Sequence, residues 1–155
     1  MTTMAGDLSS PPDRVMLDTN VLLAATDAER RGHGDAMRIL NEWSAAGTNL
    51  CVSVQVLREY LAAATRPVDS NGLGMPVPEA LANVQSFRDR TTLLPESGRG
   101  IDRLVNLLRD VACAGKQIHD ANVVATMLVH NVRAVVTMNL KDFARFEPYV
   151  NLIGI

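Results

Sequence analysis

Short runs of apolar residues recur along the chain and predict β-strands. Five such runs occupy residues 15–17, 50–52, 91–94, 134–136 and 152–153. The first, second and fourth stop at the polar residues Asp18, Ser53 and Thr137. Continuous apolar runs of this length are typical of parallel strands that are covered on both faces.

Between these runs, apolar residues recur every three or four positions, which is the period of an amphipathic helix. The period covers residues 36–43, 54–64, 101–111 and 123–127. Strands that alternate with helices predict an α/β domain with a mainly parallel central sheet flanked by helices. Residues 65–78 contain three Pro and two Gly and are expected to form a long surface loop, because a helical pattern resumes directly after them.

Composition and charge indicate a single folded domain. The chain has 155 residues, of which 47% are hydrophobic and 21% charged, as in an average globular protein. Residues 1–13 are small, polar and Pro-containing, so we expect a flexible N-terminal tail before a domain over 14–155. The net charge of −2 gives no overall basic field, so any affinity for nucleic acid must come from a local patch. Neither a signal peptide nor a membrane segment is expected, which predicts a cytoplasmic location.

Four acidic residues lie where they could meet in one cleft. Asp18 follows the first predicted strand and Asp142 follows the strand that ends at Thr137, and ligands of α/β sheets bind outside the carboxyl ends of strands. Asp120 begins a buried apolar face of one predicted helix, and Glu59 interrupts a small apolar surface on another. Carboxylates gathered together repel one another unless a cation joins them, and oxygen ligands without His or Cys suit Mg²⁺ or Mn²⁺.

Each acid also has a structural explanation of its own. Asp18 and Asp120 are placed to cap a helix or to lie against its dipole. Glu59 alone is typical of a solvated helix residue, and Asp142 is typical of an acid at a helix start. The functional interpretation therefore depends on all four acids meeting in the folded chain.

Four segments resemble the motifs of PIN-domain ribonucleases, especially the VapC-type toxins of bacterial toxin–antitoxin pairs. They are VMLDTNVLL at 15–23, SVQVLRE at 53–59, IHDA at 118–121 and VTMNLKDF at 136–143. The motifs follow the order of the family, and the resemblance covers residues 14–155. The loop over residues 65–74 is similar to a segment seen in a subset of these toxins.

This resemblance implies a single PIN-like domain and a Mg²⁺-dependent endoribonuclease, with Mn²⁺ as a substitute, that hydrolyses RNA with a metal-activated water. It implies Asp18 and Asp120 as metal ligands, with Glu59 acting through water and Asp142 as a further catalytic acid. An RNA substrate, a cognate antitoxin protein and a homodimer are the implied partners. Candidates for holding the RNA backbone are Lys141, Arg99 and Arg103.

One position departs from the family pattern. Asn139 stands where many PIN nucleases carry Asp. Either Asp142 takes the fourth acidic role, or Asn139 holds the metal or its waters through a neutral oxygen; its place nearer the strand end favours Asn139. A neutral ligand supplies less negative charge to hold a second metal ion, so the sequence leaves open whether the site binds one metal ion or two. Thr137 and Asn20 are expected to position the site or to contact substrate.

Two alternative functions stay open on the sequence. An Asp-nucleophile phosphohydrolase would use Asp18, but that chemistry expects a second acid two residues later, where the chain has Asn20. A catalytically weakened PIN-fold interaction module would explain Asn139 but not the retention of all four acid-bearing segments. Calorimetric measurement of Mg²⁺ binding distinguishes this module from the nuclease.

Overall fold

The structure of the protein is a computed structural model that describes residues 10–155. Most of the tail expected over residues 1–13 therefore lies outside the described residues. A central sheet consists of β1 (Arg14–Leu17), β2 (Asn49–Ser53), β3 (Thr92–Leu94), β4 (Ala134–Thr137) and β5 (Asn151–Gly154). Its order is β3-β2-β1-β4-β5, and every neighbouring pair is parallel. The expected α/β fold with a parallel sheet is confirmed.

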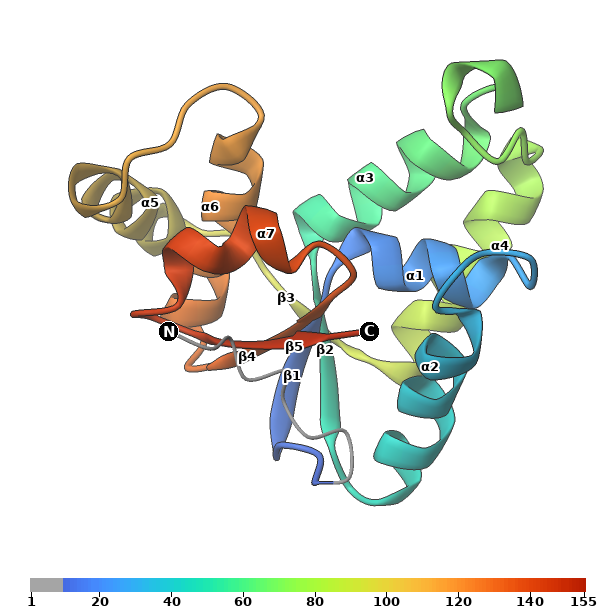
Figure 1. Cartoon of the computed structure of the whole chain (residues 1–155), viewed down its shortest axis with the longest axis horizontal. Coiled ribbons are helices and arrows are strands. Elements are labelled where there is room, and N and C mark those ends of the chain that lie inside the picture. The colour runs from blue at the N-terminus through green and yellow to red at the C-terminus, as the bar shows by residue number, and fades with distance from the viewer. Residues whose placement is uncertain (1–9) are drawn as a thin grey trace.

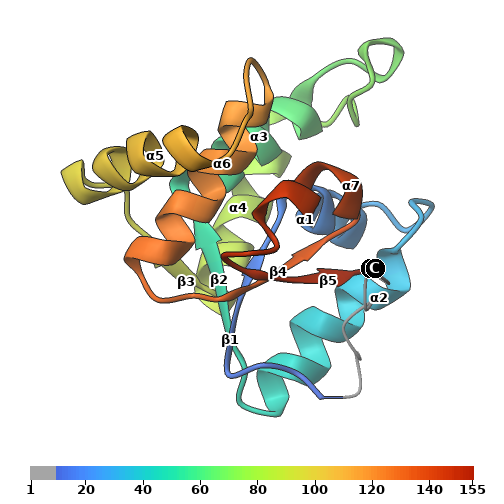
Figure 2. The same ribbon diagram turned by 60° about the vertical axis from the view of Figure 1, so that its left-hand side comes forward.

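Helices join the strands and cover the sheet on both sides. They are α1 (Thr19–Thr26), α2 (His33–Arg38), α3 (Val54–Thr65), α4 (Val77–Arg90), α5 (Gly98–Asp110), α6 (Gln117–Val129) and α7 (Leu140–Phe143). Figure 1 shows α1 to α4 on one side of the sheet and α5 and α6 on the other, and Figure 2 shows α7 above β4 and β5. No helix in the described part of the chain is long and apolar enough to cross a bilayer.

The strands are buried as their apolar runs predict. Val15, Met16 and Leu17 of β1 have no solvent exposure, and β4 is buried along its whole length. A strand between two layers of helices needs apolar side chains on both of its faces, which explains why the runs are continuous rather than alternating.

Two helical segments differ from the pattern-based expectation. The periodicity did not predict α1, because its central residues, VLLAA, are all apolar and no polar face marks the helical period. The helix expected over 36–43 is α2 followed by a π-helical turn, Ile39–Trp43, in which one extra residue enters the turn. Ile39, Leu40 and Trp43 all remain buried in this arrangement.

The connection between α3 and α4 is more ordered than the expected loop over residues 65–78. It contains a 3₁₀ turn, Val68–Ser70, and α4 already begins at Val77. The backbone N–H groups of Leu73 and Met75 donate to the carbonyl oxygens of Ala63 and Ala64 at 3.1 and 2.9 Å, so the connection folds back onto the end of α3.

The order of the strands brings functional positions together at β1. This strand pairs with β2 on one side and with β4 on the other, so the direction in which the sheet is built reverses there. Open α/β sheets bind ligands at such a reversal, outside the carboxyl ends of the strands. Asp18 and Thr137 stand at those ends, and the backbone N–H of Asp18 donates to the carbonyl of Val136 at 3.0 Å.

Candidate functional site

Asp18 both caps a helix and presents a buried carboxylate. It is 7% exposed and precedes the first residue of α1. Its Oδ1 accepts from the Thr19 backbone N–H at 2.8 Å, so the capping explanation is confirmed. Its Oδ2 accepts from the Thr137 hydroxyl, also at 2.8 Å. The cap therefore holds the carboxylate at the end of β1 and does not exclude a functional role.

Thr137 connects the ends of β1 and β4 through one hydroxyl group. The Thr137 side chain is completely buried, and its Oγ1 accepts from the Asn139 backbone N–H at 2.9 Å and from Asn20 Nδ2 at 3.5 Å. Because these donors occupy the lone pairs of the hydroxyl, its proton points to Asp18. Asn20 also accepts from the Met138 backbone N–H at 3.1 Å, so it bridges α1 and the segment after β4.

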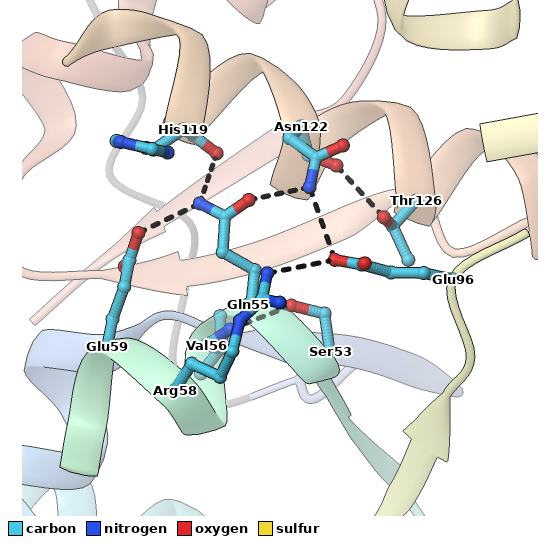
Figure 3. A network of polar contacts seen from close by, with 9 residues as sticks. All are labelled: Ser53, Gln55, Val56, Arg58, Glu59, Glu96, His119, Asn122 and Thr126. Atoms are coloured by element: carbon cyan, nitrogen blue, oxygen red, sulfur yellow. Dashed lines mark hydrogen bonds and ion pairs between the residues drawn. The ribbon is translucent and has the colours of Figure 1, made fainter. Parts of the chain in front are cut away.

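Glu59 projects from α3 with both carboxylate oxygens bound. Its Oε2 accepts from the Thr19 hydroxyl at 2.9 Å. Its Oε1 accepts from Gln55 Nε2 at 2.8 Å, as Figure 3 shows. The helix that carries it starts at a Ser53 cap, whose hydroxyl accepts from the Val56 N–H at 3.1 Å. Thr19 thus contacts both acids, because its hydroxyl donates to Glu59 and its backbone N–H donates to Asp18.

Asp120 lies in the first turn of α6 and is half-buried. Of the two structural explanations for Asp120, the cap is wrong, because α6 begins at Gln117 and Lys116 occupies the cap position, whereas its place in the first turn agrees with a position against the helix dipole. Burial raises the pKa of Asp120 to about 7, and the charges of Asp18, Asp142 and Glu59 add to the increase. Its carboxylate is therefore within electrostatic reach of the other three acids.

Asp142 and Asn139 form a separate contact at the start of α7. Both side chains are exposed, and the Asn139 amide donates to the Asp142 carboxylate. The Asp142 backbone N–H donates to the Asn139 carbonyl at 3.1 Å, which closes the first turn of the helix. The Asp142 carboxylate also raises the pKa of Asp18 and that of Asp120.

Burial and hydrogen bonding shift the pKa of Asp18 in opposite directions. The pKa of Asp18 is raised to about 6, mainly by burial and to a smaller extent by the charges of Glu59 and Asp142, while the hydrogen bonds from Thr137 and Thr19 lower it. Asp18, Glu59, Asp120 and Asp142 are called the acidic site below. The four segments that carry them are far apart in sequence and meet at the reversal point of the sheet.

The donor set of the acidic site fits a hard divalent cation. Burial without a paired base makes the carboxylates of Asp18 and Asp120 costly to ionise, and bound positive charge removes that cost. Neither ion pair found in the described residues involves the acidic site. Among these residues no three His, Cys, Asp or Glu side chains lie together as a group that could hold a metal ion.

A basic residue that the sequence did not single out lies close to the acidic site. The charge of Arg145 lowers the pKa of Asp120, partly opposing the effect of burial. Its guanidinium also donates to the Ala112 carbonyl at 3.3 Å, which holds the side chain near α6. By contrast, no hydrogen bond or ion pair in the described residues joins the acidic site to Lys141, Arg99 or Arg103.

A family model, described as PIN domain, matches residues 15–147. The chain belongs to the PIN domain family. Comparison with curated protein sequences finds none similar enough to be a relative.

Solved structures share this PIN fold at low sequence identity. VapBC2 from Rickettsia felis has a TM-score of 0.69 at 18% identity, over 92% of this chain and 98% of that chain. VapC20 from Mycobacterium tuberculosis, described as a sarcin–ricin loop cleaving toxin, has a TM-score of 0.65 at 15% identity, over 88% of this chain and 97% of that chain. VapBC-1 from nontypeable Haemophilus influenzae has a TM-score of 0.63 at 17% identity, over 91% and 97%.

Sequence reasoning placed the acids of this PIN domain in one group and named Thr137, which donates to Asp18, but missed the residues that hold Glu59. Thr19 and Gln55 bind Glu59, and Asn122 binds Gln55. One signal was available for Gln55, since it stands four residues before Glu59 on a predicted helix, where side chains face each other. No local pattern connects Asn122 or Arg145 to the site, because their contacts depend on how the helices pack.

Proposed function

We propose that this PIN domain is a Mg²⁺-dependent endoribonuclease, with Mn²⁺ able to replace Mg²⁺. The observation that carries the proposal is the pair of desolvated carboxylates, Asp18 and Asp120, beside two further acids at the reversal point of the sheet. Site geometry of this kind favours phosphodiester hydrolysis over an interaction module, because a surface used only for docking gains nothing from burying unpaired acids.

In this proposal Asp18 and Asp120 hold the metal ion and Glu59 contacts its waters. When bound, the ion activates a water and offsets the charge that develops on the phosphate. The Thr137 hydroxyl holds the Asp18 carboxylate in place, and Asn20 holds the segment after β4. The charge of Arg145 lowers the pKa of Asp120, so Arg145 is our first candidate for a phosphate contact.

The fourth position of the site remains a choice between Asp142 and Asn139. Proximity to the end of β4 favours Asn139, as the sequence suggested. The observed hydrogen bond supports the other choice, because the Asn139 amide group donates to Asp142 and the Asp142 charge reaches both Asp18 and Asp120. We propose Asp142 as the charged member and Asn139 as the residue that orients it.

The biological role that we propose is that of a toxin in a toxin–antitoxin pair. The likeness to VapBC complexes from several bacteria supports a cognate antitoxin as partner. We also propose a homodimer in the cytoplasm, as the family resemblance of the sequence implies. Copurification with the product of a neighbouring small gene, and light scattering of the isolated protein, test the two parts separately.

Cleavage of a labelled RNA by the purified protein tests the proposed chemistry. We expect cleavage with Mg²⁺ or Mn²⁺, none after treatment with EDTA, and no recovery with Ca²⁺, which prefers a larger and more flexible ligand set. The variants Asp18→Asn and Asp120→Asn keep the size of each side chain and remove one charged ligand, so both should be inactive while folded. Cleavage at an unchanged rate in EDTA, or by either variant, contradicts the metal mechanism.

A further inference from the structure

Gln55 is a buried polar residue to which the proposed chemistry gives no task. It lies in the first turn of α3 and is 5% exposed. Its amide group lies between α3 and α6, at the centre of the polar network in Figure 3. An amide buried without partners costs a protein about 1–3 kcal/mol, so the burial of Gln55 depends on the groups around it.

Every polar atom of the Gln55 side chain has a partner. Its Nε2 donates to Glu59 Oε1 and to the His119 carbonyl oxygen, both at 2.8 Å, and its Oε1 accepts from Asn122 Nδ2 at 2.6 Å. Turning the amide over would place its oxygen against a carboxylate and a carbonyl, and its NH₂ against another NH₂. The network therefore allows a single orientation of this amide.

Two acids of the acidic site depend on the position of this amide. Glu59 is held on one oxygen by Gln55 and on the other by Thr19, so its carboxylate has little freedom to turn. His119 immediately precedes Asp120, and its carbonyl is the second group that Gln55 binds. One side chain thus links the Glu59 carboxylate to the turn of α6 that carries Asp120.

The link adds no positive charge. A Lys or Arg in this place would hold Glu59 as well but would weaken the attraction of the acidic site for a cation. An amide supplies hydrogen bonds and leaves the full negative charge of the carboxylates available. The ion pair of this network, Arg58 with Glu96 at 3.6 Å, lies further out, where the two side chains are 65% and 39% exposed.

We propose that Gln55 is a positioning residue. It orients Glu59 and fixes the spacing of Glu59 from Asp120 before a divalent cation binds. The inference deepens the proposed function and rests on it. Groups that orient metal ligands commonly change metal affinity by about 10–100-fold when they are removed. Loss of Gln55 should therefore raise the Mg²⁺ requirement although every proposed ligand is still present.

The test compares Gln55→Met with Gln85→Met as a matched control. Gln85 makes the same kind of contact on α4, donating to Asp89 four residues later at 2.8 Å, but on an exposed surface. For Gln55→Met we expect calorimetric titration to show Mg²⁺ binding weakened by about tenfold, and the Mg²⁺ concentration at half-maximal RNA cleavage to rise by the same factor, with the rate largely recovered at saturating Mg²⁺. Gln85→Met should match the wild type. A purely structural role would lower the rate at every Mg²⁺ concentration.

Further outcomes separate this inference from the proposed function. If the wild type needs Mg²⁺ and Gln55→Met has a Mg²⁺ requirement within twofold of it, the positioning role is wrong and the nuclease proposal stands. If the wild type needs no metal, the proposed function itself fails. Should Gln55→Met not fold, Asn122→Ala decides, because it keeps the Gln55 side chain and removes its 2.6 Å partner, together with the 3.5 Å contact between Asn122 and the exposed Glu96. A Mg²⁺ requirement raised two- to threefold supports the inference, and an unchanged one overturns it.

Discussion

The hydroxyl group of Thr137 affects the ionisation of Asp18 in the acidic site. Thr137 donates to Asp18, and hydrogen bonds of this kind stabilise an ionised carboxylate and lower its pKa. Burial outweighs them, and the pKa of Asp18 remains at about 6. The Asp18 carboxylate is therefore fixed in orientation while its ionisation stays costly, which is the condition under which the proposed cation would stabilise it most.

The pair Asn139 and Asp142 gives a prediction at the scale of single residues. Asp142→Asn removes a charge that acts on Asp18 and Asp120, so Mg²⁺ binding should weaken and RNA cleavage should fall by about 100-fold. The separate variant Asn139→Asp should not strengthen Mg²⁺ binding, because its new carboxylate would face the Asp142 carboxylate, to which the Asn139 amide now donates.

Calorimetric Mg²⁺ titration of both variants checks this assignment. Tighter binding in Asn139→Asp, together with unchanged binding in Asp142→Asn, would show that Asn139 and not Asp142 occupies the fourth position. The exposed acid Asp89 on α4 supplies a control, since Asp89→Asn removes one charge far from the reversal point of the sheet and should leave the titration unchanged.

The elements of the fold were predictable to different degrees, for physical reasons. Strands between two helical layers must be apolar on both faces, so their runs stand out in the sequence. By contrast, α1 shows no amphipathic period because its central residues are all apolar. The π-helical turn at Ile39–Trp43 could not be predicted because it depends on how its side chains pack. Asp18, Asp120 and Asp142 were recognised from their places at the ends of elements, and Glu59 from an apolar helix surface that it interrupts. Gln55 was missed because its contact with the His119 carbonyl forms only when α6 lies beside α3.

Gly72 is the residue on which the α3–α4 connection depends most. A Cβ atom added there would lie 2.0 Å from the carbonyl oxygen of Arg66, and that oxygen already accepts from the Gly74 N–H at 2.8 Å. The backbone must shift to admit even one methyl group, so Gly72→Ala should lower the free energy of unfolding by about 1–3 kcal/mol.

Urea unfolding of the metal-free protein measures this effect, with Gly100→Ala as the control. Gly100 lies in α5 with no atom within 4 Å of an added Cβ, and Ala is a better helix former than Gly, so this variant should be as stable as the wild type or more so. Equal stability of the two variants would show that the connection is free to adjust.

At the scale of the whole molecule, gathering acids at the reversal point of the sheet makes stability depend on pH. The pKa values of Asp18 and Asp120 rise from 3.8 to about 6 and about 7 on folding. The folded state therefore binds protons more tightly than the unfolded state. The contribution of these groups is most favourable below about pH 4 and is lost as pH rises towards 7.

Comparison of Asp18→Asn with the wild type isolates this effect. Without metal, the variant should be more stable than the wild type at pH 7 by on the order of 2–3 kcal/mol, the free energy equivalent of the shift in the pKa of Asp18. The difference should shrink towards pH 4. Urea unfolding in EDTA from pH 4 to pH 8 provides the measurement, and a difference that stays constant or grows at low pH contradicts the assigned pKa. Saturating Mg²⁺ should reverse the order at pH 7.

The strand order also has a consequence for synthesis of the chain on the ribosome. β1 is made first and gains β2 early, but its other edge stays open until residues 134–137 are made and enter the sheet as β4. Domains begin to fold from the N-terminus during translation. The Thr137 hydroxyl that orders Asp18, and Asp142 a few residues later, come from the last part of the chain. A nascent or truncated polypeptide that ends before β4 therefore contains three of the four acids but lacks the strand that completes their site.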